Sequence, residues 1–498
     1  MVLLEEPIKE PVMVKNYING EFVESESEEQ LDVINPATQK VIGKVPISLP
    51  DELNAAVDAA LDAFEEWRKT PPLARARYMF RLKALLEEHF EESARIGVME
   101  HGKTIDEFRG EVRRGIENVE VATGIPSLMM GYNLQDIAVG IDEMVVREPI
   151  GVFAIIAPFN FPYMIPFWFW PYAVATGNCV IIKPSSEVPL SQYKVAQLVD
   201  EVGFPPGVIN FVNGNRRVVK AMLENPNISG YCFVGSTRVG KEVIYVGAAK
   251  QGKKAICQCS AKNYLVVMED CDIERTTSSI MTSFFGNAGQ RCLAGGNLAI
   301  VTKDDAFYRK VVNAVVEKAK RIVVGYGLDT EVTMGPIRSV DKKERIVGYI
   351  EKGIEEGAKL ILDGRKPKIK GDYPETCFLG PTIFEDVTPD MVIAKEEIFG
   401  PVMPIIRFES LDEAIDAINT KTKYGNAATI YTSNGKYARQ FTYEVKCGNI
   451  GINIGIVAPM AFFPFGGMRD SFFGDRHGQG RDAIEFFTER KVVITRWW

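Results

Sequence analysis

The chain has 498 residues, of which 46% are hydrophobic and 25% are charged, so we expect an ordinary globular protein with more than one core. Its net charge of -8 disfavours nucleic acid and anionic membranes as partners, and no apolar run approaches the ~20 residues of a membrane span. Residues 1–15 lack the basic and apolar regions of a signal peptide, which predicts a cytoplasmic location.

Cysteines and histidines are few and do not have the spacing of a metal site. Eight cysteines in a chain of this length do not form a disulfide framework. Cys257 and Cys259 alternate along a predicted strand, where packing explains them better than metal binding. The three histidines also lack metal-ligand spacing, so we expect no metal and no catalytic Cys–His pair.

The amino-terminal part reads as a hairpin followed by helices. An Asn-Gly pair within residues 17–22 predicts a tight β-turn. Asp51 is expected to cap a helix with one apolar face. Further helices are predicted over about 73–97 and 105–124, the second with Thr104 as its N-cap.

From residue 151 the pattern changes to short apolar strands that alternate with helices. Strands are predicted over 151–157, 178–183, 208–212 and 229–234, with helices over 189–202 and 216–223 and another opened by 235–240. This alternation predicts a parallel sheet of the dinucleotide-binding type. A second α/β pattern runs over about 270–450. The end, 486–498, reads as a lone strand that would pair with another subunit.

The stretch from Gly286 to Ala294 places Cys292 in a turn that glycines flank. A thiolate is a strong nucleophile, and glycines let a substrate and backbone amides approach it closely. Arg291 beside it is expected to favour the ionised sulfur. Read alone, Cys292 could equally be a small buried hydrophobic residue.

Three other stretches contain the groups that such a nucleophile needs. Asn160, between aromatic and proline neighbours, could donate its amide to an oxyanion, or could be a simple turn residue. Lys183 ends a predicted strand, where doubly wound sheets bind ligands, although a solvated lysine would fit too. The glycine-rich segment 235–240 could bind phosphate or be a plain turn, and 396–401 could be a solvated helix end.

Together these stretches resemble the aldehyde dehydrogenase superfamily, from Tyr17 to the carboxyl terminus. The resemblance rests on the Asn-Gly-Glu-Phe start and on segments 158–162, 183–185, 234–240, 289–292, 397–401 and 464–467. Within the superfamily, segments 127–131, 157–166 and 289–292 are most similar to the acylating methylmalonate-semialdehyde dehydrogenases.

The resemblance implies an α/β fold with two α/β domains and a small β element. Residues 1–127 and 150–261 would form the Rossmann-like dinucleotide-binding domain, 262–475 the catalytic domain, and 128–149 with 476–498 the element for oligomerisation. It also implies a homo-oligomer, a dimer or a tetramer.

The resemblance assigns a role to each matching residue. Cys292 would form a thiohemiacetal and then a thioester with the aldehyde, while the Asn160 amide and the Cys292 N–H hold the oxyanion. Cofactor contacts would come from Lys183, Ser185 and Ser186 at the adenosine ribose, Gly235 and Ser236 at the pyrophosphate, and Glu397 and Phe399 at the nicotinamide ribose. Arg114 and Arg291 would grip a substrate carboxylate, although Arg113 looks equally available.

Two departures from the superfamily pattern matter. Gln258 stands where hydrolytic members have the glutamate that activates water, and it has no basic site. The acylating members also lack that glutamate and pass the acyl group to coenzyme A, with decarboxylation of a β-carboxylated substrate before the transfer. Ser186 stands where NAD-preferring members commonly have a glutamate, so we expect NADP to be favoured or at least accepted, with NAD as the alternative.

The sequence therefore predicts an NAD(P)-dependent oxidation of a small aldehyde, with a carboxylated semialdehyde and acyl transfer to coenzyme A as the leading interpretation. One alternative is a non-acylating, NADP-dependent enzyme that releases the free acid. Another is a non-catalytic protein on the same fold.

Overall fold

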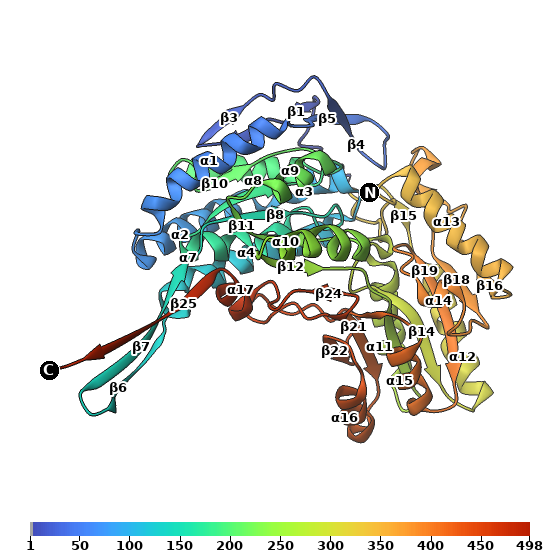
Figure 1. The fold of residues 1–498 in the computed structure, drawn as a ribbon. Helices are drawn as coiled ribbons and strands as arrows, with labels where there is room; N and C mark the ends of the chain where they lie inside the picture. The colour runs from blue at the N-terminus through green and yellow to red at the C-terminus, as the bar shows by residue number, and fades with distance from the viewer. Residues whose placement is uncertain (1–2) are drawn as a thin grey trace.

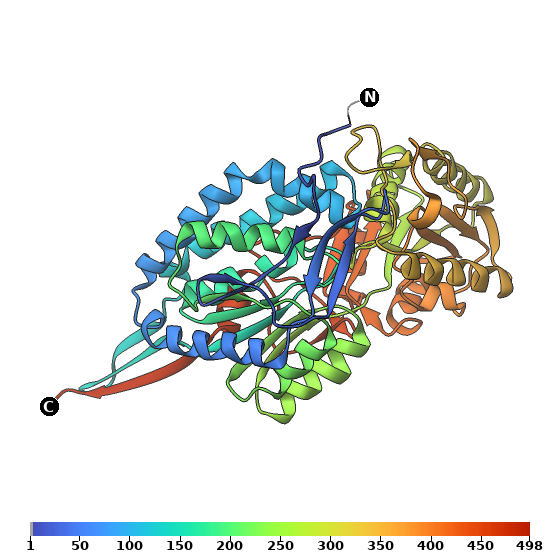
Figure 2. The same cartoon turned by 90° about the horizontal axis from the view of Figure 1, so that it is seen from above.

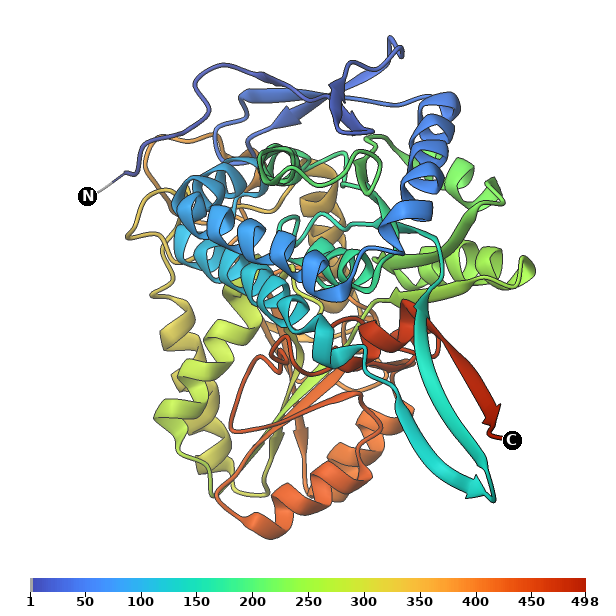
Figure 3. The same ribbon diagram turned by 90° about the vertical axis from the view of Figure 1, so that its left-hand side faces the viewer.

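The computed structural model describes residues 3–498, so the first two residues of the amino-terminal segment considered above lie outside the described residues. Two large sheets flanked by helices lie side by side, and a β arm projects away from them (Figures 1 and 3). The α/β fold class predicted from the sequence is confirmed. Within residues 3–498, no helix has both the length and the apolar character needed to cross a membrane.

The first sheet has eight strands in the order β24-β12-β11-β8-β9-β10-β2-β3. Their bounds are β2 Asn16–Ile18, β3 Glu21–Val23, β8 Val152–Ile156, β9 Cys179–Lys183, β10 Ile209–Phe211, β11 Ile228–Val234, β12 Lys254–Gln258 and β24 Phe472–Phe473. The strands from β8 to β12 pair in parallel, and the order β10-β9-β8-β11-β12 is that of a dinucleotide-binding fold, as predicted. Because the order reverses between β8 and β11, the loops after these strands border a crevice at their carboxyl ends.

The predicted hairpin forms one edge of this sheet. Strands β2 and β3 pair antiparallel, and Asn19 and Gly20 between them have φ values of 53° and 80°. Two consecutive left-handed residues make the turn that matches the twist of a two-strand ribbon, which is why Asn-Gly predicts it.

Helices of the amino-terminal half cover the first sheet, as Figure 2 shows from above. They are α1 Pro50–Trp67, α2 Pro72–Glu88, α3 Phe90–His101, α4 Ile105–Thr123, α5 Ile125–Leu128, α6 Met164–Phe167, α7 Trp170–Thr176, α8 Leu190–Val202, α9 Arg216–Glu224 and α10 Val246–Lys250, with a π-helix, η1, at Val239–Tyr245. The segment 235–240 therefore leads into a widened π-helical turn before α10 begins.

Two of the predicted helix boundaries are wrong. The N-cap of α1 is Leu49, whose N–H donates to the carboxylate of Glu52 at 2.6 Å. Asp51 therefore lies inside the first turn of the helix and does not cap it. The helix predicted over 73–97 is two helices, since His89 leaves helical geometry with ψ at 18° and caps α3. The Thr104 cap is confirmed, with its hydroxyl accepting the Glu107 N–H at 3.4 Å.

The second large sheet has seven strands in the order β16-β18-β19-β14-β13-β21-β22. Their bounds are β13 Asn263–Met268, β14 Gly295–Val301, β16 Lys359–Leu362, β18 Thr382–Glu385, β19 Val402–Phe408, β21 Ala427–Tyr431 and β22 Asn449–Ile452. All its pairs are parallel except the edge strand β16 with β18. This is the second α/β pattern predicted over about 270–450.

Further helices and small sheets complete the described chain. The helices are α11 Ile273–Phe285, η2 Gly286–Gly289, α12 Asp305–Ala319, α13 Val340–Glu355, η3 Glu375–Cys377, α14 Val392–Lys395, α15 Leu411–Thr420, α16 Gly435–Glu444 and α17 Gly480–Phe486. The small sheets pair β1 Val12–Met13, β5 Val41–Pro46 and β4 Gln30–Ile34, then β15 Val324–Gly325 with β17 Ile369–Lys370, and β20 Tyr424–Gly425 with β23 Met468–Arg469.

The arm is a three-stranded antiparallel sheet of β6 Tyr132–Ala138, β7 Ile141–Pro149 and β25 Thr488–Arg496. β25 pairs with β7 from Thr488 opposite Pro149 to Arg496 opposite Ile141, so the expectation of a lone carboxyl-terminal strand is wrong. The outer edge of β25 has no partner strand within the described chain. The arm carries exposed apolar side chains on each strand, among them Leu134, Met144 and Ile494.

Candidate active site

The turn that precedes Cys292 has an unusual backbone. After α11, Asn287 and Ala288 have φ values of 51° and 48°, a left-handed conformation that costs non-glycine residues about 1–3 kcal/mol each. The carboxylate of Glu107, on α4, accepts the Asn287 N–H at 2.5 Å and offsets part of that cost. The backbone leading to Cys292 is therefore fixed by a helix that lies far from it in the sequence.

Cys292 itself is partly exposed on the wall of a cavity of about 340 Å³. Its carbonyl accepts the side-chain amides of Asn263 at 2.9 Å and Asn426 at 2.8 Å, which hold its backbone from the second sheet. Burial, with a smaller effect of the Glu397 carboxylate, raises the pKa of the Cys292 thiol to about 12. The Arg291 guanidinium favours the ionised sulfur, as expected, but its lowering of the pKa is smaller than the increase caused by desolvation.

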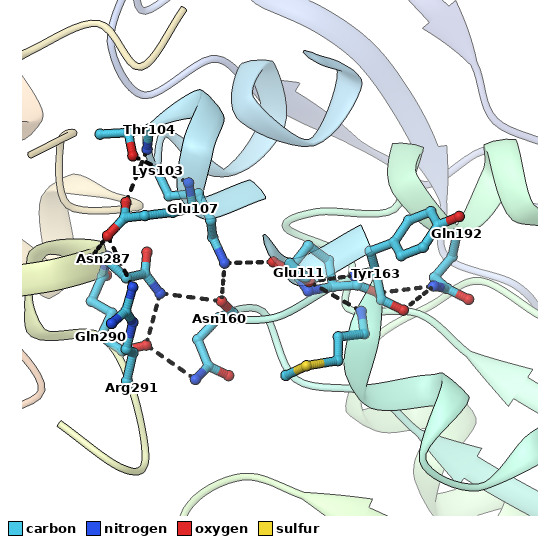
Figure 4. A network of polar contacts seen from close by, with 12 residues as sticks. Lys103, Thr104, Glu107, Glu111, Asn160, Tyr163, Gln192, Asn287, Gln290 and Arg291 are labelled. Carbon is cyan, nitrogen blue, oxygen red and sulfur yellow. Dashed lines mark hydrogen bonds and ion pairs between the residues drawn. The ribbon is translucent and has the colours of Figure 1, made fainter. Parts of the chain in front are cut away.

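Asn160 lies in the loop that follows β8, buried beside the Cys292 turn (Figure 4). Its side-chain Nδ2 donates to the carbonyl of Gln290 at 3.1 Å, and its own carbonyl accepts the Asn287 side-chain amide at 3.3 Å. One N–H of the Asn160 amide is thus bound, and the second remains for another acceptor. The structure brings Asn160 and the Cys292 turn together, as the sequence predicts.

Arg114 and Arg291 line the same cavity as Cys292. Arg291 forms an ion pair with Glu107, with 2.9 Å between Nη2 and Oε1, while Arg114 lies 3.4 Å from a carboxylate oxygen of Glu117. The alternative residue, Arg113, is not part of the cavity lining and forms an exposed ion pair with Glu87. The rest of the wall is largely apolar and includes Phe161, Met164, Trp168, Ile456 and Phe465.

Gln258 ends β12 and is buried next to the cavity. Its Nε2 donates to the carbonyl of Phe465 at 2.9 Å, and its Oε1 is buried without a hydrogen-bond partner in the described structure. An amide has no proton-accepting site of useful basicity, so the side chain can only orient a neighbouring group.

The predicted cofactor residues follow the carboxyl ends of adjacent strands. Lys183 ends β9, and its ammonium donates to the carbonyls of Pro184 at 2.6 Å and Gly214 at 2.8 Å. Burial lowers the pKa of Lys183 to about 8. Gly235, after β11, donates its N–H to the Gln258 carbonyl at 3.0 Å, so this N–H is not free for phosphate.

The serines of the cofactor segment make only long local hydrogen bonds. The hydroxyl of Ser185 accepts the Glu187 N–H at 3.4 Å, and that of Ser236 accepts the Val239 N–H at 3.5 Å. Ser186 lines a separate cavity of about 430 Å³ together with Glu187 and Lys342. The carboxylate of Glu187 lies 2.7 Å from the Lys342 ammonium, so it is already paired.

Glu397 and Phe399 approach the site from the second sheet. The Glu397 carboxylate accepts the Ala261 N–H at 2.8 Å, and burial raises its pKa. Phe399 has a left-handed φ of 60°, and its ring meets the edge of Phe159 at 5.9 Å between centroids. Lys262 lines a small cleft with Glu397, and burial lowers its pKa to about 7.

Comparisons with known proteins identify the family. Residues 22–493 match the aldehyde dehydrogenase family. The chain belongs to this family. Malonate-semialdehyde dehydrogenase 1 of Geobacillus kaustophilus is 46% identical over 487 residues, which cover 98% of each protein.

Two solved structures superpose over nearly the whole chain. Methylmalonate-semialdehyde dehydrogenase of Oceanimonas doudoroffii is 39% identical with a TM-score of 0.95, covering 98% of each chain. A Sinorhizobium meliloti protein, complexed with NAD, is 37% identical with a TM-score of 0.95, covering 98% of this chain and 99% of its own. As a member of the aldehyde dehydrogenase family, the protein is an oxidoreductase that acts on aldehydes with NAD(P).

Sequence reasoning missed several residues that hold this dehydrogenase site together. Glu107 binds both Arg291 and the turn before Cys292, and Lys103 and Glu111 contact the Asn160 loop. The spacing of Lys103, Glu107 and Glu111, four residues apart, is typical of one helix face, although Lys103 lies just before the N-cap of α4. That spacing was the available signal, but it also fits an ordinary solvated face.

Proposed function

We propose that the protein oxidises a small aldehyde that carries a carboxylate, of the malonate or methylmalonate semialdehyde type, and transfers the acyl group to coenzyme A. The observation that carries the proposal is the cavity in which the Cys292 thiol shares its wall with Arg114 and Arg291. Guanidinium groups bind carboxylate through paired hydrogen bonds, and the apolar remainder of the wall suits a short carbon chain. The names of the relatives at 45–46% identity support the same substrate class.

The chemistry would proceed on Cys292. Its sulfur attacks the aldehyde carbon, and the carbonyl oxygen becomes an oxyanion that accepts the free N–H of the Asn160 amide and the Cys292 N–H. When bound, NAD(P) supplies the acceptor for the hydride. Loss of hydride leaves a thioester on Cys292. Because the thiol pKa is raised in the structure, ionisation of Cys292 must be assisted when substrate and cofactor assemble.

The residues present fit a dinucleotide. The proposed cofactor residues of the first sheet lie at or after the carboxyl ends of β9 and β11, next to the point between β8 and β11 where the strand order reverses. Lys183 keeps a third N–H beyond its two carbonyl contacts, and the Ser236 hydroxyl borders the start of η1. The Ser186 position supports acceptance of NADP, since a hydroxyl does not repel a 2′-phosphate.

Gln258 supports coenzyme A as the acyl acceptor. Without a carboxylate at this position, water lacks a base, whereas a thiol attacks a thioester more readily. The thiol of coenzyme A would displace the Cys292 sulfur, which leaves with the electron pair of the broken bond. With a β-carboxylated substrate, loss of carbon dioxide would come before this transfer.

We also propose the domain division and assembly expected from the sequence. The first sheet, with 1–127 and 150–261, would bind the cofactor, and the second, within 262–475, would complete the catalytic site. The arm, with its exposed apolar side chains and the free edge of β25, would join two copies into a dimer or tetramer.

One assay tests the proposal. The absorbance of NADH or NADPH is followed with malonate semialdehyde, methylmalonate semialdehyde and propanal, each with and without coenzyme A. Preference for the carboxylated aldehydes and formation of an acyl-coenzyme A would support it. Equal use of propanal, or full-speed release of the free acid, would favour the non-acylating alternative, and no turnover together with an unreactive Cys292 thiol would favour a non-catalytic protein.

A further inference from the structure

A buried ion pair lies behind the loop that carries Asn160. Lys103 immediately precedes the N-cap of α4, and Glu111 lies within that helix, eight residues further along the chain. Both side chains are fully buried, with 2.6 Å between Lys103 Nζ and Glu111 Oε2 (Figure 4). Neither residue lies in the motifs that the sequence singles out.

Both members of this pair bond to the backbone of the Asn160 loop. The Lys103 ammonium donates to the carbonyl of Asn160 at 2.9 Å. The other carboxylate oxygen of Glu111 accepts the N–H groups of Tyr163 and Met164, at 2.8 and 3.1 Å. The loop is therefore held at Asn160 by a cation and at its end by an anion, and the two charges bind each other.

Stability alone explains this arrangement poorly. Removing two charges from water costs several kcal/mol per ion, and a buried ion pair often stabilises a fold no better than apolar side chains would. The ring of Phe161 lies 3.9 Å from the ammonium and recovers part of the cost. Desolvation lowers the pKa of Lys103, and the carboxylate of Glu111 opposes that shift. What the pair does achieve is a fixed backbone from the carbonyl of Asn160 to the N–H of Met164.

The direction of the Asn160 amide depends on that backbone. The amide must give one N–H to the Gln290 carbonyl, two residues before Cys292, and present the other to the substrate oxygen. A displacement of about 1 Å at such a site can cost ~10²-fold in rate. We propose that Lys103 and Glu111 are positioning residues that hold Asn160 in this geometry, an inference that rests on the oxyanion role proposed for Asn160.

The test is a double-mutant cycle with a matched control. Glu111→Gln keeps an oxygen for the Tyr163 and Met164 N–H groups but removes the charge that binds Lys103. Because it leaves a buried ammonium unpaired, the double variant Lys103→Met/Glu111→Gln, which removes both charges, is measured beside it. The control is Glu100→Gln, since Glu100 is also fully buried and accepts two successive N–H groups, of Leu190 and Ser191, at 2.6 and 2.8 Å.

Each variant is made in the wild-type and Asn160→Ala backgrounds, with urea denaturation to confirm folding. We expect both pair variants to lower kcat by about 10–100-fold in the wild-type background, with KM for the aldehyde and Kd for the cofactor changed less than about threefold. In the Asn160→Ala background the further loss should be under about threefold, because the amide to be positioned is gone. Glu100→Gln should leave kcat within about threefold.

Two failures can be told apart. Equal losses from the pair variants in both backgrounds, or losses matched by Glu100→Gln, would show a purely structural pair and overturn the positioning role alone. An Asn160→Ala variant with unchanged kcat would overturn the proposed oxyanion role and the positioning role with it.

Discussion

The guanidinium of Arg291 lies 2.9 Å from the carboxylate of Glu107 on the wall of the cavity that holds Cys292. The same carboxylate accepts the Asn287 N–H, so one side chain of α4 binds both the arginine beside the nucleophile and the turn before it. The charge of Arg291 is therefore already balanced. Arg114 has a longer ion-pair distance, 3.4 Å to a carboxylate oxygen of Glu117, and its other contacts are with uncharged groups, the Pro459 carbonyl at 3.4 Å and the Met460 sulfur at 2.8 Å, which leaves it the more available cation for an incoming carboxylate.

Arg114→Leu should accordingly raise KM for malonate semialdehyde by about 10–100-fold, the value of losing one or two hydrogen bonds to a charged group. KM for propanal should change little, because propanal has no carboxylate. Arg113→Leu is the matched control, since Arg113 binds Glu87 outside the cavity. Steady-state kinetics with both aldehydes measures the effect, and equal changes for the two substrates would show that Arg114 does not bind the acid.

Local signals in the sequence predicted local structure well. The Asn19-Gly20 turn, the Thr104 cap and the parallel strands after residue 151 depend on neighbouring residues or on simple periodicity. The predicted start of α1 and the prediction of one continuous helix through His89 were wrong, since a pattern of apolar residues does not fix where a helix begins or bends.

The contacts that shape the site are mostly distant in the chain. Only a family resemblance could assign catalytic or substrate-binding roles to Cys292, Asn160 and Arg114. Glu107 meets Asn287 across 180 residues, and Lys103 meets Asn160 across 57, so neither pairing leaves a trace in one sequence. The raised pKa of Cys292 depends on burial in the folded chain, which the adjacent Arg291 did not reveal.

Cys292→Ala should bind cofactor but lose essentially all oxidation of aldehydes. Cys271→Ala, a change at the other partly exposed cysteine, should keep activity.

In the free enzyme the Cys292 thiol is neutral at pH 7, because its pKa is raised to about 12. Alkylation of Cys292 by iodoacetamide, followed by mass spectrometry, should therefore rise about tenfold per pH unit between about pH 7 and about pH 9. A rate that levels off near neutrality would contradict the raised pKa, and normal turnover by Cys292→Ala would exclude the nucleophile.

Ser186→Glu should shift cofactor preference towards NAD. A carboxylate near the ribose would repel a 2′-phosphate, and we expect kcat/KM for NADP to fall about 10–100-fold relative to NAD. Ser186→Ala is the control, since it removes the hydroxyl without adding charge. Strict use of NAD by the unmodified enzyme would show that residues other than Ser186 determine the cofactor preference. Lys342, which lines the same cavity, is a candidate.

Deleting residues 491–498 should disrupt assembly. The deletion removes the part of β25 from Lys491, opposite Val146, to Arg496, opposite Ile141, and so exposes the edge of β7. Light scattering should show smaller or aggregated species. As a gentler variant, Val492→Lys with Ile494→Lys keeps the strand and places charge at two exposed apolar positions. An unchanged size distribution in the deletion variant would refute a role of this strand in assembly.

Deacylation gives the sharpest test of the proposed reaction. With Gln258 at the base position, hydrolysis of the Cys292 thioester should be slow, and coenzyme A should accelerate turnover and appear in the product.

Gln258→Glu should raise the rate of turnover measured without coenzyme A. Since the Gln258 amide donates to the Phe465 carbonyl at 2.9 Å, a glutamate there would be buried against an oxygen and would hold its proton at neutral pH. The gain should therefore grow as the pH rises above the raised pKa of the new carboxyl. Gln258→Ala, which cannot act as a base, is the control and should show no gain. Full-speed oxidation by the unmodified enzyme to the free acid, indifferent to coenzyme A, would mean that another group activates water and would replace the acylating reaction with the hydrolytic one.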